Sequence, residues 1–202
     1  MQTIPTPYKI AIIGGIGSGK SVVSRLLTTM GIPVYDCDNR AKRLMNESPI
    51  LRSALIEAVG AAVYSADGHI NRPYLANYMF GHPERVTQIN HIVHPTVRAD
   101  FEAWANSSAS PLVAIETAIL YESGMDADVD AIVLVHAPME VRLQRAMQRD
   151  HADEPSIRHR MSHQMSDNEL LQRATHIIHN DERHSLIAQV QQLIATLTEQ
   201  NS

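Results

Sequence analysis

The chain has 202 residues, with 17 basic and 22 acidic side chains and a formal net charge of −5. This balance excludes the strongly basic surface that typifies nucleic-acid-binding proteins. A hydrophobic content of 44% is ordinary for a globular protein, and the length predicts one domain or one core with insertions.

The single cysteine, Cys37, excludes an internal disulfide, which fits a reducing compartment such as the cytoplasm. No apolar run approaches the roughly 20 residues that a membrane-spanning helix needs. Residues 1–8 contain two prolines and no long apolar stretch, so we expect no signal peptide. We therefore predict a soluble cytoplasmic protein without a nucleic-acid or membrane partner.

A glycine-rich loop lies between a predicted strand and a predicted helix near the start of the chain. Residues 9–13 (KIAII) are an apolar run, and residues 21–27 have helical apolar spacing. Between them, residues 14–21 (GGIGSGKS) fit the phosphate-loop pattern G-x-x-x-x-G-K-[ST]. Glycines let backbone N–H groups surround phosphate oxygens, and a helix N-terminus favours an anion. Lys20 then supplies a positive charge to the β- and γ-phosphates, and the Ser21 hydroxyl a ligand for Mg²⁺.

Two aspartates follow the next predicted strand, which begins at residues 34–35. Asp36 and Asp38 lie where this strand ends and a helix over residues 39–45 begins. In open parallel α/β sheets, ligands bind at this end of the strands. A carboxylate there could activate a hydroxyl or help to hold a metal, and Asp38 could equally be the N-cap of the helix. Both roles stay open at this point.

Residues 49–110 are predicted to be entirely helical. Apolar spacing indicates helices over residues 49–64, 72–80 and 83–104, and Pro95 should kink or restart the last of them. A turn is expected at residues 65–68 and a polar break at 106–110. Such an insert between strands of a nucleotide-binding sheet could cover a second substrate, or it could simply cap the sheet.

Three further strands are predicted over residues 111–116, 131–135 and 175–178. The first ends at Glu116, which is typical of the acidic residue that closes the second nucleotide motif of phosphate-loop enzymes. Glu122 follows on a predicted helical turn. Helices are expected from residue 138, around residues 170–171 and over residues 183–197.

Arginines are concentrated in the segment that follows residue 138. Arg142, Arg145 and Arg149 are three and four residues apart, which predicts one helix face. Arginine forks suit phosphate oxygens and charge in phosphoryl transfer, although neighbouring acidic residues would also fit a solvated face. Arg158 and Arg160 follow in a polar segment that could be mobile and close over a nucleotide.

The eleven histidines include two closely spaced pairs. His91 and His94 are three residues apart, and His159 and His163 are four apart. Neither pair has a cysteine or a second paired carboxylate to complete a ligand set. The spacing therefore favours ordinary surface or core histidines over a transition-metal site.

Taken in order, these motifs resemble those of the dephospho-CoA kinase family over residues 10–180. The phosphate loop matches the family's form closely. Asp36 and Asp38 match its paired aspartates, with Cys37 where a small residue is usual. His94–Pro95 matches a characteristic His-Pro pair.

Other segments of the resemblance are weaker or carry substitutions. Asn71–Arg72 and Leu75 resemble the family's segment after the Asp67–Gly68 turn, with Asn71 in place of a common aspartate. Residues 120–122 resemble the end of a Pro-Leu-Leu-x-Glu segment in which Ala118 and Ile119 replace Pro-Leu. The remaining matches are Arg145 with Arg149–Asp150 as lid arginines, Arg160 with Gln164, and residues 178–180.

The resemblance implies an α/β fold of the P-loop NTPase type, with three layers, a parallel sheet, a helical acceptor-binding insert and a helical lid. The nucleotide-binding core would be residues 1–48 and 111–202, with the lid at about 142–164. Residues 49–110 would bind the acceptor. The implied reaction, the final step of coenzyme A biosynthesis, is ATP-dependent phosphorylation of the ribose 3′-hydroxyl of dephospho-CoA, with Mg²⁺.

The resemblance also assigns roles to individual residues. Lys20, Asp38 and Arg145 would be catalytic, with Asp38 taking or orienting the hydroxyl proton. Ser21 would hold the metal. The ATP-binding residues would be Gly15, Ile16, Gly17, Ser18, Gly19, Lys20, Ser21, Val22, Arg145, Arg149 and Asn180. The acceptor-binding residues would be Asp38, Arg72, His94 and Glu122.

Three other interpretations compete with this one. Another small-molecule P-loop kinase, acting on nucleosides or nucleotides, would share the loop and the lid arginines. A GTP-dependent switch would need an N-K-x-D stretch, which the sequence lacks. A protein that only binds nucleotide is disfavoured because Lys20, Ser21, Asp38 and Arg145 are all present. Monomeric and small homo-oligomeric forms both remain open.

Overall fold

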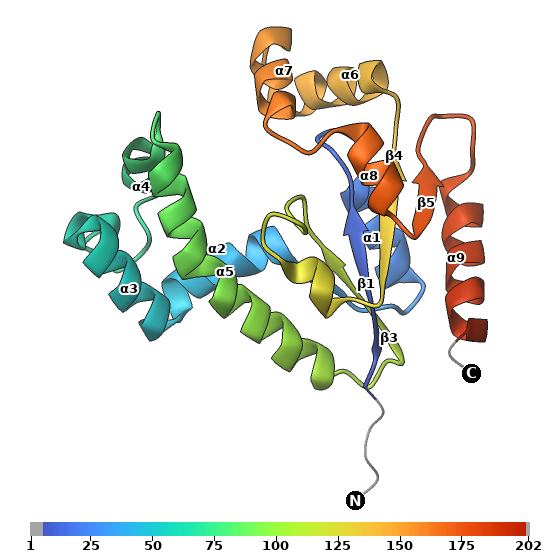
Figure 1. The fold of residues 1–202 in the computed structure, drawn as a ribbon, viewed down its shortest axis with the longest axis horizontal. Coiled ribbons are helices and arrows are strands. Elements are labelled where there is room, and N and C mark those ends of the chain that lie inside the picture. The colour runs from blue at the N-terminus through green and yellow to red at the C-terminus, as the bar shows by residue number, and fades with distance from the viewer. Residues whose placement is uncertain (1–5, 201–202) are drawn as a thin grey trace, which may run out of the picture. The chain divides into compact units, whose positions relative to one another are not determined.

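The computed structural model in Figure 1 describes residues 6–200. Most of the segment predicted not to be a signal peptide, residues 1–5, lies outside these residues. The chain divides into two compact units, one of Met1–Tyr35 with Ala105–Ser202 and one of Asp36–Trp104. Among the described residues, no helix combines the length and the apolar character that crossing a membrane would require.

The first unit is built on a sheet whose strand order is β2-β3-β1-β4-β5. Its strands are β1 (Tyr8–Ile13), β2 (Val34–Asp36), β3 (Leu112–Glu116), β4 (Ala131–His136) and β5 (His176–His179). β1 pairs in parallel with both β3 and β4, and β4 pairs in parallel with β5. The predicted parallel α/β sheet is therefore confirmed, with the strand that precedes the phosphate loop in its middle.

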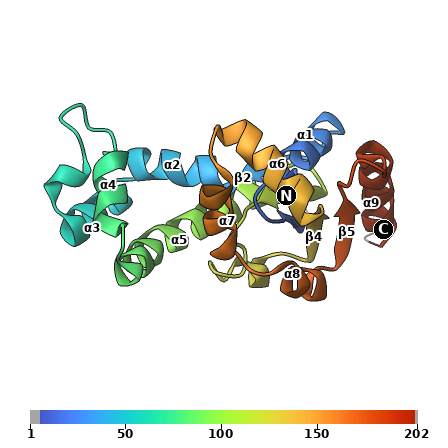
Figure 2. The same cartoon turned by 90° about the horizontal axis from the view of Figure 1, so that it is seen from above.

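Helices cover both faces of this sheet. α1 (Lys20–Thr29) and α9 (Leu186–Gln200) contribute Val23, Leu27, Val190 and Leu193 to one apolar core with the strands. α8 (Asp167–Arg173) packs against β4, and Figure 2 shows it on the side of the sheet away from α1. A short 3₁₀ helix, η2 (Met125–Asp128), follows β3. The sheet is thus the middle layer of three.

Two packed helices follow β4. α6 (Met139–Asp150) and α7 (Glu154–Ser162) are joined by a short loop in which His151 adopts a left-handed conformation. Asp153 caps the start of α7 through its side chain. The apolar contact between the two helices is formed by Leu143, Ala146, Ile157 and Met161. Arg158 and Arg160 therefore lie on a regular helix.

The second unit is helical, as predicted, apart from an isolated antiparallel bridge between Tyr64 and Ile70. Its helices are α2 (Cys37–Glu47), α3 (Pro49–Val59), the 3₁₀ helix η1 (Ala61–Val63), α4 (Arg72–Met79) and α5 (Pro83–Asn106), which extends into the first unit. Its buried core includes Leu51, Leu55, Val63, Phe101 and Val97.

Three predicted helix boundaries or interruptions were wrong. The helix predicted to reach residue 64 ends at Val59, because Gly60 has a φ of +100° that an α-helix does not allow. α5 runs through Pro95 without a restart, since a missing proline N–H removes only one hydrogen bond of a ladder held on both sides, and the kink at Pro95 stays a prediction. α9 begins at Leu186 instead of residue 183, because the Asp181 side chain accepts the N–H groups of Arg183 and His184.

Candidate phosphoryl-transfer site

The phosphate loop leaves the central strand β1 and leads directly into α1. Gly17 and Gly19 have φ angles of +78° and +95°, which favour glycine. Gly19 is the N-cap of α1 and no side chain caps this helix start. The loop therefore has the backbone shape of an anion site, with the positive end of a helix dipole behind it. Residues 15–22, all predicted to contact ATP, lie in this loop and the first turn of α1.

Lys20 and Ser21 are the first two residues of α1. Lys20 contacts the start of the phosphate loop, and Ser21 contacts the end of β3. The Lys20 ammonium donates to the backbone oxygen of Gly14 at 2.7 Å. The Ser21 hydroxyl donates to Oε1 of Glu116 at 2.7 Å, where Glu116 is the last residue of β3. A hydroxyl and a carboxylate oxygen beside a phosphate loop are hard ligands, so this pair fits Mg²⁺. The sequence predicted Ser21 as a metal ligand but left the role of Glu116 unassigned.

The three arginines of α6 do not form one phosphate-facing surface. Arg142 is buried, with 4% of the residue exposed, and its guanidinium forms an ion pair with Asp167 at the start of α8. Arg145 donates to the backbone oxygen of Asn180 at 3.1 Å and pairs with Glu182 at 3.3 Å. The three arginines do lie on one α-helix at the predicted spacing, but their side chains have different partners and very different exposure.

Arg149 is engaged by its neighbour. Its guanidinium donates to both carboxylate oxygens of Asp150, at 2.6 and 3.0 Å, and Arg160 donates to Oδ2 of the same carboxylate at 2.6 Å. Hydrogen bonds from Arg149 and then Arg160 hold the pKa of Asp150 well below its ordinary value. The predicted contact of Arg149 with ATP stays a prediction.

Asn180 links the phosphate loop to Arg145. Its side-chain amide donates to the backbone oxygen of Ser18 at 2.7 Å, while its backbone oxygen accepts from Arg145. A Cβ on Gly19 would overlap the Asn180 amide nitrogen. Three of the predicted ATP-binding positions, Ser18, Arg145 and Asn180, are therefore joined by direct hydrogen bonds.

Asp36 and Asp38 differ in their contacts in the second unit. Asp36 is the N-cap of α2, accepting the Asn39 N–H at 3.0 Å and its side-chain amide at 2.6 Å. Asp38 lies in the first turn of that helix, and within residues 6–200 its carboxylate makes no hydrogen bond or ion pair. The interpretation of Asp38 as the N-cap was therefore wrong, and its carboxylate is uncommitted.

The other predicted acceptor-binding residues lie on both units. Arg72 is the exposed first residue of α4, which is capped by Asn71 through a hydrogen bond to the Tyr74 N–H at 3.2 Å. Asparagine and aspartate cap helices equally well, which explains how Asn71 can replace the family's usual aspartate. His94 lies on α5, where burial, and secondarily His91, lowers the pKa of its imidazole. Glu122 lies on the first unit, in the turn before η2.

Two contacts of the phosphate loop with distant residues were not predicted from the sequence. The Ile16 N–H donates to Oε1 of Gln164 at 2.8 Å, and the Arg142 Nε donates to the Ile16 backbone oxygen at 3.1 Å. Both partners lie more than 120 residues away along the chain. Only the weak family pattern that includes Gln164 marked one of them.

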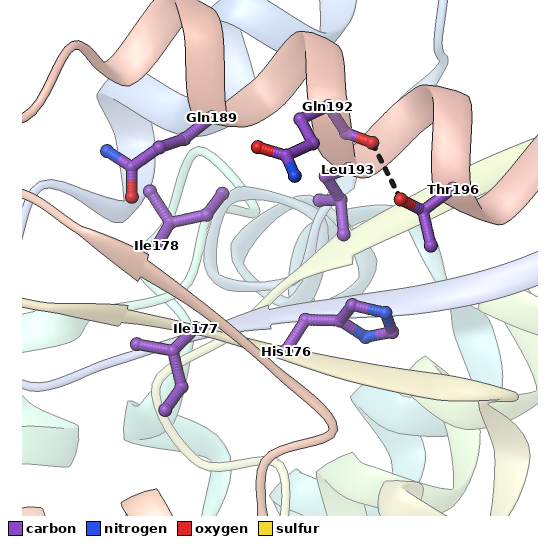
Figure 3. A pocket seen from close by; sticks show the side chains of 7 residues that line it. All are labelled: His176, Ile177, Ile178, Gln189, Gln192, Leu193 and Thr196. Atoms are coloured by element: carbon purple, nitrogen blue, oxygen red, sulfur yellow. Dashed lines mark hydrogen bonds between the residues drawn. The ribbon is translucent and has the colours of Figure 1, made fainter.

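A pocket of about 250 Å³ lies elsewhere, between β5 and α9 (Figure 3). It is lined by His176, Ile177, Ile178, Gln189, Gln192, Leu193 and Thr196. None of the residues predicted to bind ATP or the acceptor lines it. This pocket is therefore separate from the phosphate loop in both position and chemistry.

A parallel sheet with a phosphate loop after its central strand, a serine–carboxylate pair and an arginine-bearing helix pair define a P-loop kinase. Residues 8–185 match the family model described as dephospho-CoA kinase. A dephospho-CoA kinase of Bacteroides fragilis is 44% identical over 190 residues, covering 94% of this chain and 92% of that protein. The chain belongs to the dephospho-CoA kinase family.

Solved structures agree with this assignment at the level of the fold. The crystal structure of TT1252 from Thermus thermophilus has a TM-score of 0.78 and 35% identity, covering 96% of this chain and 97% of the other. The dephospho-CoA kinase from Campylobacter jejuni has a TM-score of 0.70 at 20% identity, covering 96% and 98%. The second likeness is one of fold alone.

Proposed function

We propose that the site transfers the γ-phosphate of ATP to the ribose 3′-hydroxyl of dephospho-CoA, giving coenzyme A and ADP. Family membership supports the acceptor. The observation that carries the chemistry is the Ser21–Glu116 hydrogen bond beside Lys20, because it sets a metal-ligand pair against a phosphate-binding loop. This is the final step of coenzyme A biosynthesis.

The first unit holds the donor in this proposal. N–H groups of the loop and of the start of α1 surround the phosphates, apart from the Ile16 N–H, which donates to Gln164. Lys20 exchanges its bond to the Gly14 oxygen for the β- and γ-phosphate oxygens. Ser21 and Glu116 would hold Mg²⁺, which when bound neutralises charge between those phosphates. Lys20 and the bound metal would therefore compensate the negative charge of the ATP phosphates in the bound state.

Arg145 stabilises the charge that spreads over the transferred phosphoryl group. Its bond to Asn180 places its guanidinium on the same network as Ser18 in the phosphate loop. Its pair with Glu182 is largely exposed and therefore weak enough to be exchanged for phosphate. Arg149 would add a second positive charge on releasing Asp150.

The acceptor is activated by Asp38. The proton of the ribose 3′-hydroxyl passes to an Asp38 oxygen as the hydroxyl oxygen bonds to the γ-phosphorus and the bond to ADP breaks. Asp36 is unsuited to this role because its two oxygens are engaged by Asn39. Residues 49–110 form the acceptor-binding segment, with contacts from Arg72 and His94, and Glu122 adds a contact from the first unit.

The proposed compartment is the cytoplasm, where ATP is abundant and where Cys37 would stay reduced. The proposed partners are the two small-molecule substrates, with neither nucleic acid nor membrane required. Both a monomer and a small homo-oligomer are compatible with the proposal.

A steady-state assay with ATP, Mg²⁺ and dephospho-CoA tests the proposal directly. We expect ADP release that depends on dephospho-CoA, with a product carrying phosphate on the ribose 3′-oxygen. A parallel panel of nucleosides and nucleotides, assayed at matched concentrations, serves as the control for acceptor identity. Phosphorylation of a nucleoside well above the rate with dephospho-CoA would show that the acceptor is wrong.

A further inference from the structure

The tip of the phosphate loop is held by the helix pair α6–α7 through one residue, Ile16. Its N–H donates to Gln164, which follows α7, and its backbone oxygen accepts from Arg142 on α6. Its side chain packs against the apolar cluster of Leu143, Ala146, Ile157 and Met161 that joins the two helices. Both backbone polar groups of Ile16 and its side chain are thus held by the same pair of helices and the residue that follows them.

Arg142 is held in place from the other side. Its guanidinium pairs with Asp167, and the arginine side chain is only 5% exposed, so it has little freedom to move. A Cβ on Gly15 would overlap its guanidinium, and a Cβ on Gly17 would overlap its backbone. The glycines therefore do more than make room for phosphate, because they also let α6 approach the loop to contact distance.

From these contacts we propose that Gln164 and Arg142 are positioning residues that couple the shape of the phosphate loop to the helices α6 and α7. The inference rests on the proposed binding of ATP by this loop. With the Ile16 N–H taken by Gln164 and the Ser18 N–H donating to the Gly15 oxygen at 3.1 Å, the donors that remain for phosphate include the N–H groups of Gly17, Gly19 and Ser21. Fixing Ile16 at both its N–H and its C=O sets the direction in which those donors point. Loss of either contact therefore weakens ATP binding before it affects the acceptor.

The first test is the affinity for Mg²⁺·ATP, measured by calorimetry without acceptor. Gln164→Met keeps the length of the side chain and removes its acceptor oxygen. The dissociation constant should rise about three- to tenfold, the range expected from one side-chain hydrogen bond. The KM for ATP should rise by the same factor, while the KM for dephospho-CoA stays within about twofold.

Thr175→Val is the matched control. The Thr175 hydroxyl also holds both polar groups of a single residue, accepting the Ile132 N–H at 2.9 Å and donating to its backbone oxygen at 3.0 Å. Ile132 lies near the start of β4, at the end of the strand opposite to the one beside the loop. This variant should lose thermal stability without changing the ATP dissociation constant. An equal rise in both variants would show that the effect of Gln164 is merely structural, and the proposal would be wrong.

A second variant tests the coupling through Ile16. Arg142→Lys keeps a buried positive charge but loses the fork that reaches Ile16 and Asp167 together. It should weaken ATP binding by itself. The double variant with Gln164→Met should bind ATP less weakly than the product of the two single effects predicts, because both contacts act on one residue, Ile16. Fully multiplicative effects, or wild-type affinity in Gln164→Met, would overturn the proposal.

Failure of this inference is distinguishable from failure of the proposed function. A wild-type protein that binds ATP but does not phosphorylate dephospho-CoA would overturn the acceptor assignment alone. Normal ATP affinity in Gln164→Met, in an enzyme that does phosphorylate dephospho-CoA, would overturn the coupling alone.

Discussion

The two units differ in how far their site residues are committed to other parts of the protein. In the first unit, Lys20 contacts Gly14, Ser21 contacts Glu116 and Asn180 contacts Ser18. In the second unit, the side chains of Arg72 and His94, like that of Asp38, form no hydrogen bond or ion pair with any residue of the described range 6–200.

We interpret this difference as two requirements: the phosphate loop is held in its binding shape in advance, whereas the acceptor-binding side chains are left available for the substrate. A phosphate loop must present several N–H groups in fixed directions, so the surrounding contacts hold it in shape before ATP arrives. A carboxylate or guanidinium that awaits an acceptor is better left without an internal partner, because an internal bond would have to be broken on binding. Substitutions in the first unit should therefore cost stability or donor affinity, whereas those in the second should act mainly on the acceptor.

Lys20→Ala should give the largest effect. The charge that faces the β- and γ-phosphates is lost, so kcat should fall by about 10³-fold. The thermal midpoint should fall much less, since the ammonium's contacts with Gly14 and Gly15 in the fold are hydrogen bonds to their backbone oxygens. Steady-state kinetics and thermal unfolding measure the two quantities. Turnover within tenfold of the wild type would contradict the donor half of the site.

Asp38→Asn should lower kcat by about 10²-fold and leave the dissociation constant of ATP nearly unchanged. The matched control is Asp36→Asn on the same helix start. Asparagine caps a helix as well as aspartate, so this variant should keep both the fold and the turnover. If Asp36→Asn lost activity while Asp38→Asn kept it, the general base would be Asp36.

Gly15→Ala should destabilise the first unit by about 1–3 kcal/mol, the usual cost of forcing extra atoms into a packed site. The new methyl group would overlap the Arg142 guanidinium, which Asp167 and the Ile16 oxygen prevent from moving aside. Gly31→Ala is the comparison, since its Cβ meets no atom within 4 Å and only the backbone, with a φ of +87°, is strained. Thermal unfolding should show the larger loss for Gly15→Ala, and equal losses would contradict the contact with Arg142.

Arg72→Gln should raise the KM for dephospho-CoA by about tenfold, as expected for the loss of one charged contact to substrate. Its thermal midpoint should not change, because the side chain is exposed and makes no contact of its own.

Arg52→Gln is the control for Arg72→Gln, because Arg52 lies in the same unit but has internal contacts. Arg52 donates to the Gly68 oxygen at 2.7 Å and lies 4.2 Å from the centre of the Tyr64 ring, so its loss should lower stability and leave that KM unchanged. The distinction between acceptor-binding and structural residues would be contradicted if both variants changed the KM for dephospho-CoA, or if both changed only the thermal midpoint.

The sequence predicted best where short segments determine the structure. The apolar run of residues 9–13 and the pattern GGIGSGKS predicted a buried strand, a loop and a helix in the right order, because each is specified within a few residues. The spacing of Arg142, Arg145 and Arg149 predicted a shared face. Helical spacing gives no information about which partner each side chain finds in the tertiary structure, and Asp167, Glu182 and Asp150 separated the three.

Contacts between distant segments could not be predicted in the same way. Nothing near Ile16 in the sequence indicates that Gln164 accepts its N–H, because the contact depends on how α7 returns to the loop. Helix ends were predicted less well than the phosphate loop but better than the contacts between distant segments. Both aspartates at the start of α2 could cap a helix, and only the structure shows that Asp36 does so while Asp38 stays uncommitted.

The smallest predicted effect concerns His94 and the pH dependence of stability. Burial lowers the pKa of its imidazole below the ordinary value of about 6.5, and the positive charge of His91 lowers it further. Between the lowered pKa and about 6.5, the unfolded chain binds a proton that the folded chain does not. Stability contributed by neutral His94 is therefore fully present above that range and is lost as the pH falls through it.

His94→Gln should remove this loss, so the difference in unfolding midpoint between wild type and variant should shrink as the pH falls from 7.5 to about 5. Trp104, the only tryptophan of the chain, belongs to the second unit, so its fluorescence reports on the unit that contains His94. His91→Gln is the control, since it removes only the weaker of the two causes and should change the pH dependence less. An unchanged pH profile in His94→Gln would contradict the lowering of the imidazole pKa by burial.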